Sequence, residues 1–375
     1  LFLHCYQIDQ RYDIENNSGV LVTAVPYGQI VKSAKQPERS MVDVETYSFD
    51  GPVVFNGDSY DKVSIDDLED GDPQQFVANN GWIASIQHHF LSAIVPPAGS
   101  EWRYDVTLRN GLYNVNTIGQ QAAVAIAPGA VGVTTATLFV GPKLQDQLEA
   151  IAPKLKLTVD YGILTLLAQP LFWLLDHVHD IVKNWGWSII IVTLLIKLLF
   201  YRLTAASGRS MAKMRNLQPR MKKLQERYKD DRQALSREMM ELYKREKVNP
   251  AAGCLPILVQ MPFFLAFYWV LLESVEMRQA PFALWIQDLS TRDPYFVLPL
   301  LMGAAMLIQT KLNPAPADPI QARVMTVLPI VFTVFFAFFP SGLVLYWLTN
   351  TLLSIAQQWR INTLVEAEAK AAKAN

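Results

Sequence analysis

A lysine stands inside one of the most apolar stretches of the chain. Residues 188–204 read SIIIVTLLIKLLFYRLT, with Lys197 near the middle. Thr193 and Tyr201 stand four residues before and after it, so on a continuous helix the three side chains share a face about 80° wide. A charged side chain at the centre of a bilayer costs roughly 2.5 to 3.5 kcal/mol on insertion scales. The pattern predicts a polar stripe, with a cation in it, on a membrane helix.

The last apolar stretch carries a matching polar stripe. Its members recur at steps of three and four: Tyr346, Asn350, Ser354 and Gln357. Gln260 is a further polar residue in a third apolar stretch. Because buried polar groups cost free energy unless they find partners, we expect these stripes to face one another or to share a water-filled cavity.

The apolar stretches contain no Asp or Glu that could pair with Lys197. Glu273 and Glu276 stand at the outer end of their stretch, at a different depth. Water or a visiting anionic group must therefore offset the charge. The alternative is that the lysine stem extends to the inner membrane interface near Arg202, about 7.5 Å along the helix.

Charge and hydropathy divide the chain into a soluble part and a membrane part. Of 375 residues 51% are apolar and the net charge is -1, but residues 1–160 hold 10 Lys and Arg against 19 Asp and Glu. Residues 202–247 reverse this, with 14 against 6. Five apolar runs approach the roughly 20 residues that a membrane helix needs: 185–201, 255–272, 295–310, 324–339 and 342–356. These features predict a polytopic α-helical membrane protein with a soluble N-terminal domain.

Orientation follows from the basic segment, because short Lys- and Arg-rich loops stay in the cytoplasm. The N-terminal domain is then external and the C-terminus cytoplasmic. The predicted segments are an outer β domain (1–158), an interfacial helix (159–183), a span (184–204), a cytoplasmic helical hairpin (205–249), a span (254–273), an outer loop (274–293), a span (294–312), a cytoplasmic loop (313–322), two spans (323–339 and 341–360) and a cytoplasmic tail (361–375).

The first 140 residues consist of short β-branched runs separated by Gly, Pro, Asn and Asp, which indicates an antiparallel sandwich. The pair His88-His89 lacks further ligands at strand spacing, so packing or surface exposure is favoured over a metal site. Cys5 and Cys254 are expected on opposite sides of the membrane, which excludes a disulfide between them. The chain begins without Met or a signal peptide, so we expect a fragment that has lost its export segment.

Residues 160–183 predict an amphipathic helix along the outer membrane surface. Its apolar face comprises Leu164, Leu167, Leu171, Leu174, Leu175, Val178 and Val182. Its polar face comprises Gln169, Asp176, His179, Asp180 and Lys183.

The cytoplasmic hairpin carries methionines at helical steps in both arms: Met211, Met214 and Met221 in the first, and Met239 in the second. The KDDR stretch at 229–232 marks the turn, and Asn249-Pro250 ends the second arm. The stripe predicts a seam between the two helices. The alternative is an adaptable apolar contact surface for partners, which flexible Met side chains suit.

The motifs of common membrane enzymes are missing from the sequence. The spans contain no HExxH, no paired aspartates and no Ser-His couple at matching depth, so we expect neither an enzyme nor a metal or cofactor. An ion-coupled transporter usually keeps a carboxylate at its coupling site and often shows an internal repeat, and neither is found. A small-molecule or ion transporter using the same cavity remains the alternative, followed by a scaffolding membrane protein.

Several quoted segments resemble the YidC membrane protein insertases of Gram-negative bacteria. These are WGWSIIIVTLLIKLLFYRLT, SMAKMRNLQPRM, NPAAGCLPILVQMPFFLAFYWVL, QAPFALWIQDLS and FPSGLVLYWLTNTLLSIAQQ. The resemblance implies a five-helix core whose polar groove opens to the cytoplasm and to lipid. It also implies a periplasmic β-supersandwich domain, partial here, and a preceding transmembrane helix that this chain lacks.

The resemblance further implies that the protein inserts and folds nascent membrane proteins in the inner membrane, alone or with the Sec translocon (SecYEG and SecDF). Ribosomes and the signal recognition particle would deliver the clients. Lys197 falls where the family carries its groove arginine, and Arg202 where relatives have proline. The remaining matches to groove or substrate-slide positions are Thr193, Gln260, Tyr346 and Trp347.

Overall fold

The computed structural model describes residues 6–35, 48–71, 74–228, 231–246, 255–313 and 319–374. The chain divides into two compact units, which we describe separately. The β unit comprises Leu1–Asp160 with Glu273–Glu276, and the helical unit comprises Tyr161–Leu272 with Met277–Asn375. Cys5, Cys254, Asn249-Pro250 and the first half of the KDDR turn lie outside the described residues.

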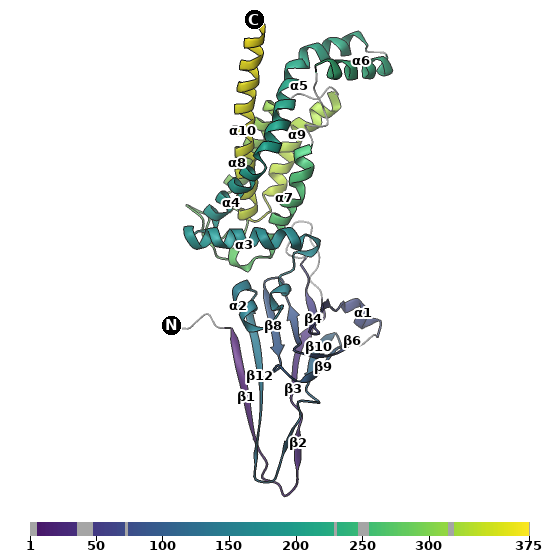
Figure 1. The fold of residues 1–375 in the computed structure, drawn as a ribbon, viewed down its shortest axis with the longest axis vertical. Coiled ribbons are helices and arrows are strands. Elements are labelled where there is room, and N and C mark those ends of the chain that lie inside the picture. The colour runs from purple at the N-terminus through teal and green to yellow at the C-terminus, as the bar shows by residue number, and fades with distance from the viewer. Residues whose placement is uncertain are drawn as a thin grey trace. The chain divides into compact units, whose positions relative to one another are not determined.

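Antiparallel strands build the β unit. A six-stranded sheet has the order β1-β12-β8-β7-β4-β5, a four-stranded sheet the order β3-β10-β9-β6, and β11 pairs with β2. The bounds are β1 Gln7–Glu15, β2 Val22–Ala24, β3 Tyr27–Ser33, β4 Gly51–Phe55, β5 Tyr60–Lys62, β6 Gln74–Asn79, β7 Trp82–Ile86, β8 Phe90–Val95, β9 Glu101–Arg109, β10 Leu112–Ile118, β11 Val124–Ile126 and β12 Val131–Pro142. Short helices α1 (Ile65–Glu69), α2 (Gln145–Ile151) and η2 (Leu155–Thr158) complete it. The longest pairing joins β1 to β12 over nine residues of each strand, side by side in Figure 1.

Alternation along the strands produces the core between the two larger sheets. In β9, Trp102, Tyr104 and Val106 are buried at every second position, as period-two side-chain placement requires. They pack in one cluster with Ile83 and Ile94 of the six-stranded sheet. The predicted antiparallel sandwich is therefore confirmed.

A segment from far along the sequence completes the β unit. Glu273 is 3% exposed, and its carboxylate accepts a hydrogen bond from Ser48 Oγ at 2.5 Å. Lys143 Nζ lies 4.0 Å from the other carboxylate oxygen and donates to the Thr158 carbonyl at 3.1 Å. Burial lowers the pKa of Lys143, and the Glu273 carboxylate opposes this shift.

The two histidines lie at the edge of the same cluster. His88 and His89 stack with ring centroids 3.7 Å apart, and His88 Nε2 lies 3.8 Å from Glu273 Oε1. Within the described residues, no group of three or more His, Cys, Asp or Glu side chains could hold a metal ion. His89 is buried, with 2% of its surface exposed, and His88 is half-buried.

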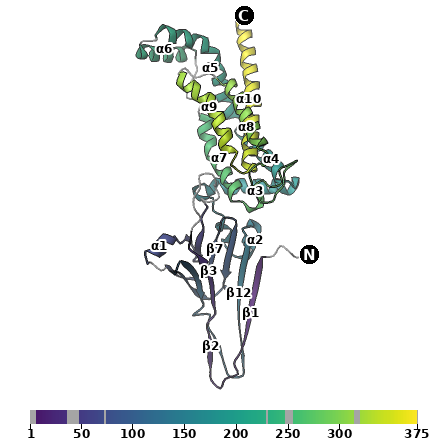
Figure 2. The ribbon, with the colours of Figure 1, turned by 180° about the vertical axis from the view of Figure 1, so that it is seen from behind.

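The helical unit consists of η3 (Gly162–Leu164), α3 (Thr165–Val182), α4 (Trp185–Leu199), α5 (Tyr201–Arg227), α6 (Arg232–Arg245), α7 (Leu255–Glu273, whose last residue belongs to the β unit), α8 (Val297–Leu312), α9 (Pro319–Phe336) and α10 (Ser341–Ala374), with η5 (Val275–Met277) at the unit boundary. The 34-residue α10, yellow in Figures 1 and 2, runs through the segment predicted as a separate tail. The boundary predicted at residue 360 is therefore not a helix end. No strong helix breaker stands there, since the sequence continues INTLVEAEAKAA.

The helix predicted at 184–204 breaks at Phe200. Asn184 caps its beginning, since its side chain accepts a hydrogen bond from the Trp187 amide. The two parts, α4 and α5, are bent by 70°. Tyr201 and Arg202 consequently begin a new helix, so the prediction that Tyr201 continues the stripe of Thr193 and Lys197 is wrong.

In the described part of the chain, no helix taken singly is long and apolar enough to cross a membrane, whereas α4 and α5 together meet that test. Shorter apolar helices occur at Leu258–Glu273, Val297–Leu312 and Arg323–Phe336.

Helix α3 is less one-sided than its sequence indicated. It buries Ala168, Leu171, Phe172 and Leu175, in agreement with part of the predicted apolar face. However, Leu166, Trp173 and Ile181 are largely exposed. The location of α3 along the outer membrane surface stays a prediction.

Helices α5 and α6 form the predicted hairpin, side by side in Figures 1 and 2. Leu217, Met221 and Leu242 form its buried seam, against which Met214 and Met239 pack. The seam interpretation of these methionines is therefore correct. Met214 and Met239 remain partly exposed, so a contact surface for partners that includes them stays a prediction.

We expect Glu273→Leu to lower the free energy of unfolding of the β unit by about 3 kcal/mol, because it leaves the buried Lys143 ammonium without its carboxylate. Hydrogen exchange of peptides from β7 and β12 measures this. The double variant Lys143→Met/Glu273→Leu should recover most of the loss, since an apolar pair can replace a buried ion pair.

Glu149→Leu is the matched control, because Glu149 forms an exposed ion pair with Lys156. It should change the stability by less than about 1 kcal/mol. Equal effects of Glu149→Leu and Glu273→Leu would contradict a stabilising role for the buried pair.

Candidate functional site

The helical unit contains a cavity of about 380 Å³ whose wall is formed by α4, α5, α7, α8 and α10. Its lining residues are Lys197, Thr204, Ser207, Gly208, Met211, Gln260, Met261, Phe264, Met306, Gln309, Asn313, Trp347, Asn350, Thr351, Ser354, Gln357 and Gln358. Hydroxyl and amide side chains outnumber the others. Their gathering between otherwise apolar helices is what the polar stripes predicted.

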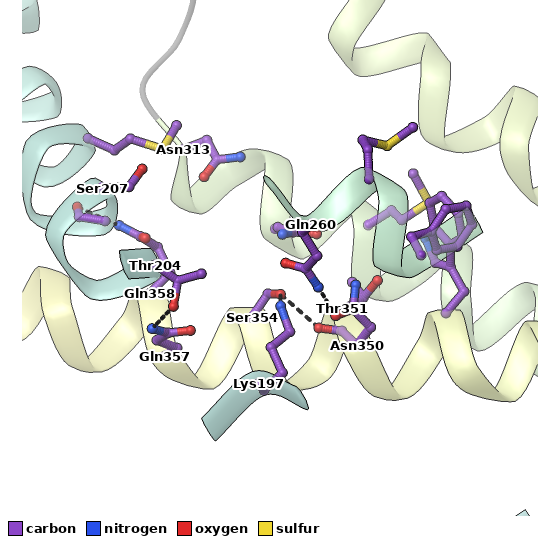
Figure 3. A pocket seen from close by; sticks show the side chains of 17 residues that line it. Lys197, Thr204, Ser207, Gln260, Asn313, Asn350, Thr351, Ser354, Gln357 and Gln358 are labelled. Carbon is purple, nitrogen blue, oxygen red and sulfur yellow. Dashed lines mark hydrogen bonds between the residues drawn. The ribbon is translucent and has the colours of Figure 1, made fainter. Parts of the chain in front are cut away.

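The Lys197 side chain is directed across the cavity to α10. Its Nζ donates a hydrogen bond of 2.8 Å to Ser354 Oγ, as Figure 3 shows. Ser354 Oγ in turn donates to the backbone carbonyl of Asn350 at 2.7 Å. In this structure the ammonium therefore does not extend to the inner interface, which was the alternative from sequence.

A second polar contact joins α7 to α10 beside this pair. Gln260 Nε2 donates to Asn350 Oδ1 at 3.0 Å, and the two amides face each other in Figure 3. Asn350 thus takes part in both contacts, through its side-chain oxygen and its backbone carbonyl. Three helices, α4, α7 and α10, are linked by consecutive hydrogen bonds.

At the other end of the cavity, α5 is held against α10. Gln357 Nε2 donates to Thr204 Oγ1 at 2.7 Å, and Gln358 Nε2 donates to the Gly208 carbonyl at 3.3 Å. The helices approach closely here, because a Cβ on Gly208 would lie 2.8 Å from Ile361 Cδ1. Glycine at this position permits the close approach.

Lys197 is the single charged side chain among the described residues that line the cavity, and none of them is Asp or Glu. In the described part of the chain, no ion pair that the structure contains includes Lys197. An ammonium has three N–H donors, and the hydrogen bond to Ser354 uses one. The site is arranged to attract a negative or strongly polar group.

The structure brings together four of the seven predicted groove residues: Lys197, Gln260, Asn350 and Ser354. Thr193 is 2% exposed and donates to the Ile189 carbonyl of its own helix. Tyr201 and Arg202 are not among the residues that line the cavity, which α5 borders from Thr204 onwards. For these three residues, the groove position stays a prediction.

The two predicted slide residues differ in their surroundings. Trp347 lines the cavity, and its ring lies 4.9 Å from that of Phe336 on α9. Tyr346 is 2% exposed, with its ring packed against Phe264 and Phe267. The slide role of Tyr346 and Trp347 stays a prediction.

Several cavity residues were missed from sequence. They are Thr204, Ser207 and Met211 of α5, Gln309 and Asn313 at the end of α8, and Gln358 of α10. Thr204, Ser207 and Met211 recur at steps of three and four, which was a usable signal for a shared helix face. Gln309 was assigned to the predicted span 294–312 and Asn313 to the predicted loop 313–322, and neither was given a role.

Two sequence families cover nearly the whole chain. Residues 2–174 match the YidC periplasmic domain, and residues 177–368 match the 60Kd inner membrane protein family. A membrane protein insertase YidC from Aromatoleum aromaticum is 51% identical over 98% of this chain and 67% of that protein. One from Stutzerimonas stutzeri is 52% identical over 98% of this chain and 66% of that protein. The chain belongs to the YidC family of membrane protein insertases.

The chain spans about two thirds of the length of these YidC relatives. A crystal structure described as an active YidC insertase with the first transmembrane domain resolved is 22% identical, with a TM-score of 0.47 over 81% of this chain and 78% of that one. As a YidC family member, the chain is located in the bacterial inner membrane with its N-terminal domain in the periplasm. YidC insertases are not enzymes.

We expect the cavity to hold water, which cysteine labelling can test. In a variant without Cys5 and Cys254, a cysteine at Gln309 should react with a charged maleimide at least fivefold faster than one at Ile308. A thiol needs water around it to ionise and react. Ile308 is a suitable comparison because its side chain is not buried, with 52% of its surface exposed, and yet it does not line the cavity.

The neighbouring position on the same helix is the control for local unfolding, because unfolding would expose both cysteines. Equal rates at the two positions would contradict a hydrated cavity. Labelling after denaturation shows that both thiols are present and reactive.

Proposed function

We propose that this protein inserts nascent membrane proteins into the bacterial inner membrane and assists their folding, using the Lys197 cavity. One observation carries the proposal: an ammonium group faces a polar cavity between apolar helices, and none of the described lining residues is a carboxylate. Such a cavity lowers the free energy of an acidic or polar peptide segment at membrane depth. Family membership supports the same activity.

Electrostatics gives the first step of the mechanism. Two opposite unit charges 4 Å apart interact by about 1 kcal/mol in bulk water and by about 4 kcal/mol at an effective dielectric constant of 20. The polar tail of a client would therefore settle beside Lys197 before it crosses the membrane. The surrounding amides and hydroxyls offer hydrogen bonds to its backbone.

Short helices lower the barrier that remains. Helix α8 has 16 residues and is about 24 Å long, against roughly 30 Å of hydrocarbon in an ordinary bilayer. A bilayer that adapts to such helices is locally thin, so the tail has less hydrocarbon to cross. Burial of the client's own apolar helix in lipid then drives insertion, and the membrane potential assists negative tails.

The client helix would leave the cavity along α9. Trp347 forms part of the cavity wall, and its ring contacts Phe332 and Phe336. The exposed side of α9 carries Val327, Val331 and Phe335 at steps of four. This apolar row and Trp347 give a client helix a continuous path to lipid.

The partners follow from this activity. The clients are nascent membrane proteins, which would come from ribosomes through the signal recognition particle or from the Sec translocon (SecYEG and SecDF), and membrane lipids surround the helices. The exposed basic side chains of the α5–α6 hairpin, among them Lys222 and Lys223, suit the phosphates of ribosomal RNA. The protein works without a cofactor or nucleotide hydrolysis.

A small-molecule or ion transporter remains the alternative from sequence. Coupling sites of such transporters usually contain a carboxylate. None of the described residues lining the cavity is acidic, so no observation favours transport over insertion.

In cells depleted of their own insertase, the full-length protein should restore insertion of a client with a short acidic tail. Lys197→Glu should reduce this insertion at least tenfold, because a like charge repels the tail, whereas Lys197→Arg should retain most of it. Protease protection of the translocated tail measures insertion.

The same client with a neutral tail is the control, and Lys197→Glu should affect it far less. Normal insertion in depleted cells without the protein would contradict the insertase function itself. Equal behaviour of Lys197→Glu and Lys197→Arg would contradict the role of the charge.

The double variant Lys222→Glu/Lys223→Glu should reduce cosedimentation with ribosomes severalfold, because it reverses two exposed charges facing a phosphate-rich partner. The buried seam of α5 and α6 is unchanged, so the hairpin should remain folded. The reduction in cosedimentation caused by the charge reversal should become larger as the salt concentration falls.

Lys222→Arg/Lys223→Arg keeps both charges and is the matched control. Unchanged cosedimentation of the charge-reversed variant at low salt would show that the ribosome does not bind this part of the hairpin.

A further inference from the structure

We propose that Ser354 is the positioning residue of the cavity cation: its hydroxyl holds the Lys197 ammonium at the cavity wall and away from the inner interface. The inference rests on the proposed insertase function and adds a residue that controls where the charge acts. It assigns Ser354 a role through Lys197 and not through direct contact with the client.

The hydroxyl of Ser354 is oriented by its own helix. Its proton points to the Asn350 carbonyl, 2.7 Å away, so its oxygen lone pairs are available to another donor. Lys197 Nζ occupies that position at 2.8 Å. A hydroxyl whose proton is already committed can only accept from the ammonium, which fixes the direction of this hydrogen bond.

The neighbouring amide makes its hydrogen bond to a different helix. Asn350 Oδ1 accepts the hydrogen bond from Gln260 Nε2 at 3.0 Å, which ties α7 to the turn of α10 just before Ser354. In Figure 3 the Lys197 amine lies against Ser354, while Gln260 and Asn350 form the adjacent pair. The cation and the amide pair therefore share Asn350 as a common support.

A lysine needs such a support more than an arginine would. Its flexible stem can carry the ammonium towards the inner interface, where hydration is better. Lys197 stands five residues before Arg202, where the basic segment begins that the charge pattern places in the cytoplasm, so the stem can carry the ammonium in that direction. The hydrogen bond to Ser354 opposes this movement and leaves two N–H donors for a client.

Ser354→Ala removes the acceptor with little change in volume. In depleted cells carrying the full-length protein, we expect insertion of the acidic-tailed client to fall about fivefold, somewhat less than the full value of a hydrogen bond to a charged group because water replaces part of it. Insertion of the neutral-tailed client should stay within about twofold of the parent, since no charge must be positioned for it.

Ser354→Thr keeps the hydroxyl and should restore insertion of the acidic-tailed client. Thr363→Ala is the matched control, because Thr363 is an exposed hydroxyl residue of the same helix that donates to the Trp359 carbonyl in the same way, at 3.0 Å. It does not line the cavity and should leave both clients unaffected.

The effect of Ser354→Ala in a variant without the lysine distinguishes positioning of the ammonium from a structural role of Ser354. In a Lys197→Met background, where no ammonium remains, Ser354→Ala should cause no further loss for either client. A further loss there, or equal losses for both tails in the parent background, would show that Ser354 only stabilises the helix packing and would overturn the proposal.

The outcomes also distinguish this inference from the function on which it rests. If depleted cells insert both clients without the protein, the insertase function fails, whatever Ser354 does. If insertion depends on the protein and on Lys197 but Ser354→Ala is without effect on the acidic-tailed client, the positioning role fails alone.

Discussion

A positive charge persists between apolar helices only where polar groups or water replace what it loses on leaving bulk solvent. In this protein the replacement is a short series of hydrogen bonds, from Lys197 to Ser354 and from Ser354 to the Asn350 backbone. The Gln260 amide braces the same turn from α7. These hydrogen bonds link α4, α7 and α10, and at the same time they solvate the Lys197 ammonium.

The bend at Phe200 has a function within this arrangement. Because α4 ends two residues after Lys197, α5 is free to turn by 70° and to bring Thr204 and Gly208 against α10. In a straight helix, Thr204 and Gly208 would have continued along the direction of α4 instead of contacting α10. The break at Phe200 therefore places α5 where it forms one wall of the cavity. The apolar composition of the sequence alone did not reveal this break.

The fold class could be predicted because its signals are local. Strand alternation, such as that of Trp102, Tyr104 and Val106, and long apolar runs both follow from side-chain periodicity. The cavity residues Lys197 and Ser354 were found because polar groups in apolar runs are conspicuous. Tyr201 was assigned to the wrong helix, because a bend depends on tertiary packing. The burial of Tyr346 could not be predicted, because it depends on neighbours such as Phe267, which are far away in sequence.

The dependence of the β unit on Glu273 sets an order for its assembly. Lys143 and the strands around it are synthesised more than a hundred residues before the carboxylate that faces this lysine. The ion pair of Lys143 with Glu273 can therefore form only after α7 has been synthesised, so this stabilising contact of the β unit forms late in the synthesis of the chain.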